Sequence, residues 1–207
     1  MEDVDGPEQL GMEVVRWDIA TTVAGGLIGV NPFDESGFQE TKDVTKSLLS
    51  DGSHQVPAAL PIDAAARSIL AATDRDGYVA ILAWVDRTEQ NERALGELRA
   101  TLAEQTQATT ILSYGPRYLH ATGQLHRSGR GCGAFLHIFE TPSQDLNIPH
   151  APFTFGTLFA AQMAADAITL HSAGVPLVRV EAGTDLSTMV HRLIDAVSLS
   201  AVVAGDA

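Results

Sequence analysis

The feature that most constrains this chain is a regular alternation of two sequence patterns between residues 62 and 203. Short, nearly continuous apolar runs such as YVAILAWV and GAFLHIFE are typical of strands that are buried on both faces of a sheet. Longer segments with apolar residues at helical spacing lie between them. Strands that alternate with helices predict an α/β fold, with a mostly parallel sheet of about four strands covered by helices on both faces. The predicted strands are residues 78–85, 108–114, 133–140 and 176–182.

The composition excludes several classes of protein. A net charge of −13 with only 13 Lys and Arg argues against a nucleic-acid-binding surface, because phosphates are neutralised by clustered basic side chains. The single cysteine, Cys132, excludes an internal disulfide and a cysteine-based zinc site, and its place at the start of a strand predicts a buried side chain. No apolar run has the length of a membrane span, and the acidic start is unlike a signal peptide. We therefore expect a cytoplasmic protein without a membrane partner.

The first fifty residues have a different pattern. Residues 10–29 place apolar side chains at helical spacing with little charge, which is typical of a nearly buried helix. A turn at 31–34 leads to a second predicted helix, which begins near Ser36 and reaches about Leu49. Residues 51–61 are rich in Gly, Pro and Ser and predict a linker. The expected domains are therefore 1–50 and 62–207.

The stretch Ser113–Gly131 is the strongest candidate for a ligand site. It contains three arginines, two histidines and four glycines, and it follows a predicted buried strand. In open α/β sheets, ligands bind at the loops that leave the carboxyl ends of the strands. A glycine-rich loop allows close approach of backbone N–H groups to an anion, and arginine binds phosphate with two hydrogen bonds. We expect an anion or phosphate site here; the alternative is a solvated basic loop.

Other candidate residues are less specific. Lys42 on the second helix is consistent with a surface lysine as well as with a catalytic one. Glu35, just before that helix, is either a general base or a favourable charge at the helix start. His120 and His126 have no neighbouring carboxylates, which disfavours a metal site, although either imidazole could move a hydroxyl proton. No nucleotide-binding or hydrolase motif occurs, so we expect no cofactor and no metal.

Two stretches together resemble one family. GGLIGVNPFDESGFQETK at 25–42 is similar to the segment of glucose-6-phosphate isomerases in which an Asn-x-Phe-Asp-Gln turn leads into a helix with the catalytic lysine. YGPRYLHATGQLH at 114–126 resembles the carboxyl-terminal region of bacterial bifunctional transaldolase/phosphoglucose isomerase proteins. The similarity runs in the same order from about Met12 to Glu181.

The resemblance implies roles for individual residues. Lys42 matches the lysine that assists opening of the sugar ring. Glu35 stands at a substrate-binding position where the family usually has Gln. Arg117, His120, His126 and Arg127 are implied to bind substrate, with Arg127 at a position where Lys is usual. The chain then corresponds to the end of a sugar isomerase (SIS) domain, residues 1–50, followed by the carboxyl-terminal α/β domain.

The implied activity is interconversion of glucose-6-phosphate and fructose-6-phosphate through ring opening and a cis-enediol. No residue is assigned to the family's glutamate base, so we expect the isolated chain to be inactive and to need upstream SIS and transaldolase segments or another copy. In the family, the helix at residues 14–28 would cover a sheet of the SIS domain. Most of that sheet has no counterpart in this sequence, so the apolar face of the helix should be partly exposed. The alternatives are a non-catalytic sugar-phosphate-binding or assembly domain, and a purely structural α/β module.

Overall fold

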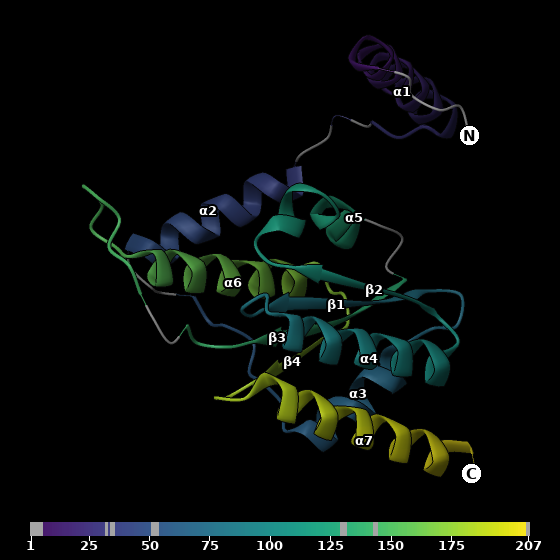
Figure 1. Ribbon diagram of the computed structural model, residues 1–207, viewed down its shortest axis with the longest axis vertical. Coiled ribbons are helices and arrows are strands. Elements are labelled where there is room, and N and C mark those ends of the chain that lie inside the picture. Colours follow the sequence, from purple (N-terminus) through teal and green to yellow (C-terminus); the bar gives the residue numbers. More distant parts are fainter. Residues whose placement is uncertain are drawn as a thin grey trace. The chain divides into compact units, whose positions relative to one another are not determined.

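The structure is a computed structural model that describes residues 6–31, 33, 36–50, 54–128, 132–142 and 145–205 (Figure 1). The chain divides into two compact units, Met1–Ser36 and Gly37–Ala207. The predicted linker at 51–61 lies within the second unit, and its described part runs beside the last strand: the Leu60 amide donates to the Arg179 carbonyl at 2.8 Å. The domain boundary at 51–61 therefore stays a prediction.

The first unit contains helix α1 (Pro7–Ile28), which Gly29 ends in the left-handed conformation with φ 72°. Its apolar side chains are exposed, including Trp17 at 69% and Leu27 at 83%. The expected nearly buried helix is thus wrong for this unit, because its described part holds no second element against which α1 packs. The partly exposed apolar face that we expected at residues 14–28 is present.

The second unit is built on four parallel strands: β1 (Tyr78–Trp84), β2 (Thr109–Tyr114), β3 (Gly133–Phe139) and β4 (Leu177–Glu181). Their order in the sheet is β2-β1-β3-β4. In the centre, Ile81 of β1 pairs with Leu112 on one side and with Leu136 on the other. The α/β class and the four-stranded parallel sheet are confirmed.

Helices cover both faces of this sheet, as predicted (Figure 1). One face is covered by α3 (Ile62–Ala72), α4 (Glu89–Thr106) and α7 (Leu186–Gly205). The other is covered by α6 (Phe155–Ser172) together with the 3₁₀ helix η1 (Arg117–His120) and the short α5 (Gly123–Ser128). Outside α6 lies α2 (Ser36–Ser50), whose Thr41 hydroxyl is 3.3 Å from that of Thr169.

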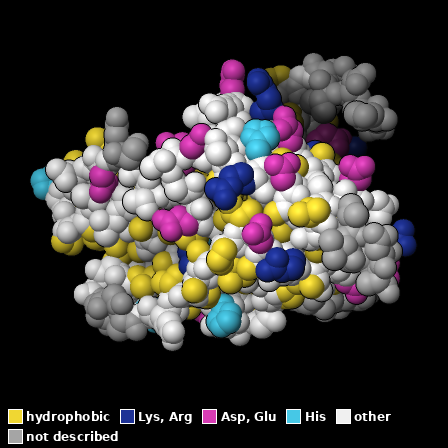
Figure 2. Space-filling model, turned by 90° about the horizontal axis from the view of Figure 1, so that it is seen from below, with side chains coloured by type: hydrophobic (Ala, Val, Ile, Leu, Met, Phe, Trp, Pro, Cys, Tyr) yellow, Lys and Arg dark blue, Asp and Glu magenta, His cyan; other side chains and the backbone are white. Residues whose placement is uncertain are grey.

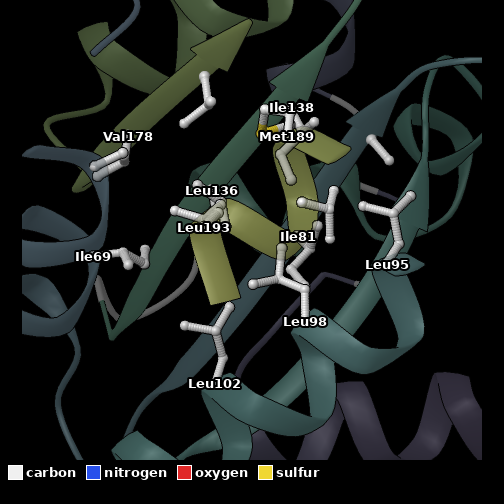
Figure 3. Close-up of a cluster of buried hydrophobic side chains, with 14 of the residues drawn as sticks. Ile69, Ile81, Leu95, Leu98, Leu102, Leu136, Ile138, Val178, Met189 and Leu193 are labelled. Atoms are coloured by element: carbon white, nitrogen blue, oxygen red, sulfur yellow. The ribbon is translucent and has the colours of Figure 1, made fainter. Parts of the chain in front are cut away.

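The face under α3, α4 and α7, which we call the apolar face, is a continuous hydrocarbon core (Figure 3). Alternate residues of the strands, such as Ile81 and Leu136, point into it because successive strand side chains lie on opposite faces. Leu98 of α4 and Leu193 of α7 meet them and are fully buried. Close packing of this kind supplies most of the driving force for folding.

The opposite face, which we call the mixed face, combines aromatic and polar side chains. Trp84 and Phe135 are buried there against η1 and α6. The same layer holds buried His137, Asp166 and Arg179, which have no counterpart among the described residues of the apolar face. The sheet is thus held by hydrocarbon packing on one side, and by a smaller aromatic cluster together with buried hydrogen bonds on the other.

Two local predictions differ from the structure. The stretch after β2 is not an open glycine-rich loop, because η1 and α5 occupy most of it; Tyr118 and His126 face inward and give these short helices a buried side. The predicted burial of Cys132 is wrong: the side chain is exposed, and β3 begins one residue later. Within the described residues, no helix has the length and apolar character that crossing a membrane requires.

Candidate functional site

The strand order defines where a ligand is expected to bind. From β1 the chain continues to α4 on the apolar face, whereas from β3 it continues to α6 on the mixed face. The carboxyl ends of β1 and β3 therefore flank a topological switch point, where open α/β sheets characteristically bind ligands. Several hollows occur at this edge among the described residues, and one of about 510 Å³ extends from Asp86 and Glu140 to the residues after β4. Two others, which share residues beside η1, are the candidates considered for a ligand.

The first, which we call the arginine hollow, has a volume of about 830 Å³ and lies beyond the ends of β1 and β2. Arg117 and His120 line it from η1 and are exposed, and Arg87 lines it from the segment after β1. The hydroxyl-bearing residues Ser113 and Thr122 also line the hollow. It thus combines cationic, imidazole and hydroxyl groups around one space.

The guanidinium of Arg87 already has partners within the protein. Its guanidinium bonds the Glu92 carboxylate and lies over the Tyr114 ring, 5.3 Å from the centroid. The hydrogen bond to Glu92 raises the pKa of Arg87 above its ordinary value. Arg117 is therefore the arginine of this hollow that we expect to meet an anion.

Gly115, between β2 and η1, determines the path of the chain into η1. Gly115 donates its backbone N–H to the Ala83 carbonyl at 2.9 Å, which continues the pairing of β1 and β2. A Cβ atom at this position would lie 2.3 Å from the Trp84 ring, so no larger residue fits without displacing the indole. The close approach of Gly115 to Trp84 places Arg117 two residues later at the rim of the hollow.

The second hollow, which we call the switch-point pocket, has a volume of about 340 Å³. Glu140, directly after β3, and Asp86, two residues after β1, bring carboxylates to it, and the Asp86 amide donates to Glu140 Oε1 at 2.5 Å. Its other walls are mainly apolar and include Leu146, Phe155 and Phe159. Val85 and Pro116 line both hollows, which are therefore adjacent.

The far wall of the switch-point pocket is held by Asp145. Its carboxylate accepts from the Gly156 amide at 2.7 Å and from the Thr154 hydroxyl at 2.5 Å, at the start of α6. The hydrogen bond from Thr154 is the main cause that lowers the pKa of Asp145. This bonding joins the 145–155 segment to the helix start and fixes the position of Leu146.

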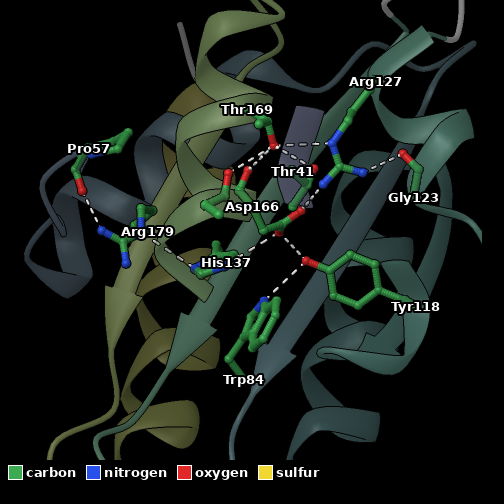
Figure 4. Close-up of polar contacts among 11 residues, drawn as sticks. Thr41, Pro57, Trp84, Tyr118, Gly123, Arg127, His137, Asp166, Thr169 and Arg179 are labelled. Carbon is green, nitrogen blue, oxygen red and sulfur yellow. Dashed lines mark hydrogen bonds and ion pairs between the residues drawn. The ribbon is translucent and has the colours of Figure 1, made fainter. Parts of the chain in front are cut away.

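Behind the hollows lies a buried polar cluster centred on Asp166 of α6 (Figure 4). The carboxylate accepts from the Arg127 guanidinium of α5 and from the Tyr118 hydroxyl of η1. The Tyr118 oxygen in turn accepts from Trp84 Nε1 at 3.1 Å, and His137 Nε2 lies 3.7 Å from Asp166 Oδ2. One carboxylate thus connects two strands and three helical segments.

Burial controls protonation in this cluster. It raises the pKa of Asp166 to about 6, against the opposing effect of Arg127, so the carboxyl group is mostly ionised at pH 7. Burial and the nearby Arg179 guanidinium lower the pKa of His137 well below its ordinary value, so that its ring is neutral. The Asp166 carboxylate and the Arg127 guanidinium therefore form the central ion pair of the cluster.

The predicted site residues fall into separate groups. Arg117 and His120 come together in the arginine hollow, whereas Arg127 and His126 are directed inward. His126 Nδ1 lies 3.0 Å from the Tyr78 hydroxyl, and burial followed by the charge of Arg127 lowers the pKa of His126 to about 4.

The two remaining predicted residues are on or near α2. Lys42 is exposed on this helix and lines neither hollow. Glu35 lies outside the described residues. Both assignments, which rest on the family resemblance, stay predictions.

Sequence reasoning missed the central residue of the buried cluster. Asp166 is the one charged side chain between Phe155 and Leu170 in an otherwise uncharged helix. A lone carboxylate in such a segment is rarely buried without a partner. That signal predicts an internal cation, and Arg127 supplies it.

The face shown in Figure 2 has no simple charge pattern. Lys and Arg lie there among Asp and Glu, with hydrophobic side chains exposed between them.

The α/β class defined by the sheet agrees with one solved structure. The crystal structure of hypothetical protein TT0462 from Thermus thermophilus matches 82% of this chain, with a TM-score of 0.55 and 15% sequence identity. This chain covers 45% of that protein, so it spans less than half of its length. At this identity the likeness concerns the fold alone. No family model matches the chain, and the search of curated proteins gave no match.

Proposed function

We propose that the α/β unit binds the phosphate group of a sugar phosphate in the arginine hollow. The observation that carries this proposal is the convergence of Arg87, Arg117 and His120 on one hollow at the carboxyl edge of the sheet. Ser113 and Thr122 add groups that donate hydrogen bonds to phosphate oxygens. Arginine binds phosphate through paired, charge-assisted hydrogen bonds, which makes Arg117 the principal anion ligand of the proposal.

We further propose that the chain is the carboxyl-terminal part of a glucose-6-phosphate isomerase linked to a transaldolase. The sequence resemblances at 25–42 and 114–126 support this assignment. In the complete enzyme, Lys42 would assist ring opening, while an upstream SIS domain or another copy would complete the site. Isomerisation also needs a carboxylate base for the enediol step. Glu140, at the end of β3, is the candidate within the described residues.

One observation favours a second candidate, a sugar-phosphate-binding domain without turnover. Arg127 and His126, which the family resemblance assigns to substrate, are engaged with Asp166 and Tyr78 inside the protein. A binding domain needs only the exposed pair Arg117 and His120. This alternative predicts affinity for sugar phosphates without isomerase activity, even when upstream segments are added.

Calorimetric titration tests the shared part of both proposals. Fructose-6-phosphate is added to the purified chain and to its Arg117→Ala variant. Loss of a charged, bidentate phosphate contact should weaken binding at least about tenfold, which corresponds to about 1.4 kcal/mol. The matched control is Arg75→Ala, because Arg75 is an exposed arginine that precedes β1 at the opposite edge of the sheet. Equal affinity in wild type and Arg117→Ala would remove the arginine hollow from consideration.

A coupled assay separates the enzyme from the binding domain. We expect no conversion of fructose-6-phosphate to glucose-6-phosphate by the isolated chain, because the catalytic set implied by the resemblance is incomplete. Conversion that is lost in a Glu140→Gln variant would contradict this expectation and would identify the base within these residues.

A further inference from the structure

The switch-point pocket has no assigned role in phosphate binding, although it adjoins the arginine hollow. We infer that it binds the hydroxylated carbon chain of the same ligand, so that the phosphate and the sugar occupy neighbouring hollows; this inference rests on the proposed phosphate site. Val85 and Pro116 line both spaces, and a ligand therefore passes from one hollow to the other over these two side chains.

The polar groups of the pocket suit hydroxyl donors. The Asp86 amide donates to Glu140 Oε1 at the end of β3, and an ionised carboxylate has further lone pairs that can accept from a ligand. Neither Lys nor Arg occurs among the described lining residues. A phosphate group in this pocket would face carboxylates and would be repelled by them. The ligand is therefore oriented with its phosphate towards Arg117 and its hydroxyl groups towards Glu140.

The apolar walls suit the carbon skeleton of a sugar. Phe159 lines the pocket and packs edge-to-face against Trp84, with ring centroids 5.3 Å apart. Because Trp84 is completely buried and its indole N–H is bonded to Tyr118, the Phe159 ring is held from behind. A fixed aromatic surface beside a fixed carboxylate is a suitable environment for the C–H and O–H groups of a polyol.

The pocket is built by specific contacts and is not a chance gap between loops. The Phe155 amide donates to the Leu146 carbonyl at 2.9 Å, which joins the two apolar residues of the outer wall. A Cβ atom at Gly156 would lie 2.8 Å from the Asp145 carboxylate, so the glycine allows this carboxylate to cap α6. These contacts hold the outer wall opposite Glu140.

The inference makes Glu140 the residue that distinguishes a sugar phosphate from inorganic phosphate. Calorimetric titrations with fructose-6-phosphate and with inorganic phosphate are compared for wild type, Glu140→Gln and Arg117→Ala. Glu140→Gln keeps an acceptor for the Asp86 amide but removes the charge. We expect it to weaken fructose-6-phosphate binding about tenfold and to leave inorganic phosphate affinity within about twofold of wild type. Arg117→Ala should weaken both ligands.

Phe159→Leu provides a second, uncharged test, because it removes the ring and keeps an apolar side chain. It should reduce the affinity for fructose-6-phosphate alone. The unchanged binding of inorganic phosphate shows that each variant is folded. If wild type binds the two ligands equally and Glu140→Gln changes neither affinity, the inference is overturned while the phosphate site stands. If wild type binds neither ligand, the proposed phosphate site fails, and the inference fails with it.

Discussion

The two faces of the sheet are stabilised in different ways. The apolar face joins α3, α4 and α7 to the strands through side chains such as Ile81, Leu98 and Leu193, without a buried charge among its described core residues. The mixed face joins α6, η1 and α5 to the same strands through the buried Asp166–Arg127 ion pair and its hydrogen-bonded neighbours. Both faces bury large side chains against the sheet, and we expect them to respond differently to mutation and to pH.

The difference indicates that the two faces have separate roles. Hydrocarbon burial stabilises a layer in proportion to its area and without directional requirements. A buried ion pair contributes little net stability, because desolvation offsets its attraction, but it penalises every arrangement in which the partners are apart. The mixed face therefore uses Asp166 to fix the position of η1, which bears Arg117 and His120. The apolar face holds the sheet, and the mixed face positions the candidate site.

The largest expected effect comes from separating the ion pair. Replacing Arg127 by Met leaves the Asp166 carboxyl group buried without its cation and should lower the free energy of unfolding by about 4 kcal/mol at pH 7. Denaturant unfolding followed by circular dichroism measures this change. Arg99→Met, at an exposed arginine of α4, is the matched control.

A double variant sharpens this comparison. Arg127→Met combined with Asp166→Leu removes both charges, and most of the lost stability should return, because no unpaired buried charge is left. The same double variant should nevertheless weaken phosphate binding if the ion pair positions η1. Normal phosphate affinity in a stable double variant would show that the cluster has no positioning role.

The next effect concerns the apolar face. Leu98 is fully buried against the sheet, and Leu98→Ala removes hydrocarbon and leaves a cavity. We expect a loss of about 3 kcal/mol in the free energy of unfolding, with the same value at pH 5.5 and pH 7.5. A loss that varies with pH between these values would mean that the two faces are not independent.

The smallest effect is a pH dependence at His126. Folding lowers the pKa of His126 from 6.5 to about 4. The unfolded chain therefore binds a proton at this histidine more readily than the folded protein does, and the free energy of unfolding decreases as the pH falls below 6.5. Asp166 acts in the opposite direction: its pKa is raised from 3.8 to about 6, so its protonation favours the folded state as the pH falls through 6.

Comparison with His126→Gln isolates the histidine. The stability difference between wild type and variant should shift by about 1 kcal/mol against wild type when the pH is lowered from 6.5 to 5.5. Thermal or denaturant unfolding at the two pH values provides the measurement. A constant difference would show that His126 is protonated as readily in the folded protein as in the unfolded chain.

The sequence predicted the part of the fold that depends on periodic burial. Ile81 and Leu136 belong to continuous apolar runs, and the strands form where these runs occur. Side-chain caps at helix starts also follow from local sequence: Asp185 accepts from the Thr188 amide at 3.1 Å at the start of α7. These features follow from local chemistry, so they can be inferred without knowledge of tertiary contacts.

The candidate site was only partly predictable, because its geometry depends on long-range contacts. Arg117 and Arg127 lie in the same short stretch, yet one faces the hollow and the other pairs with Asp166, which is distant in sequence. Composition alone cannot divide such residues between surface and interior. The exposure of Trp17 likewise depends on whether another element covers α1, and apolar periodicity does not encode this.

The strand order β2-β1-β3-β4 also has a consequence for the way the chain assembles. β1 and β2 are joined through α4, whereas β3 pairs with β1 only after α4, β2, η1 and α5 have been passed. Closing this long loop costs conformational entropy before the contacts of the new strand pair can stabilise the sheet. We therefore expect docking of β3 to limit the folding rate. Once assembled, β1 is hydrogen-bonded on both edges, and its amide protons should exchange with solvent only when the whole sheet opens.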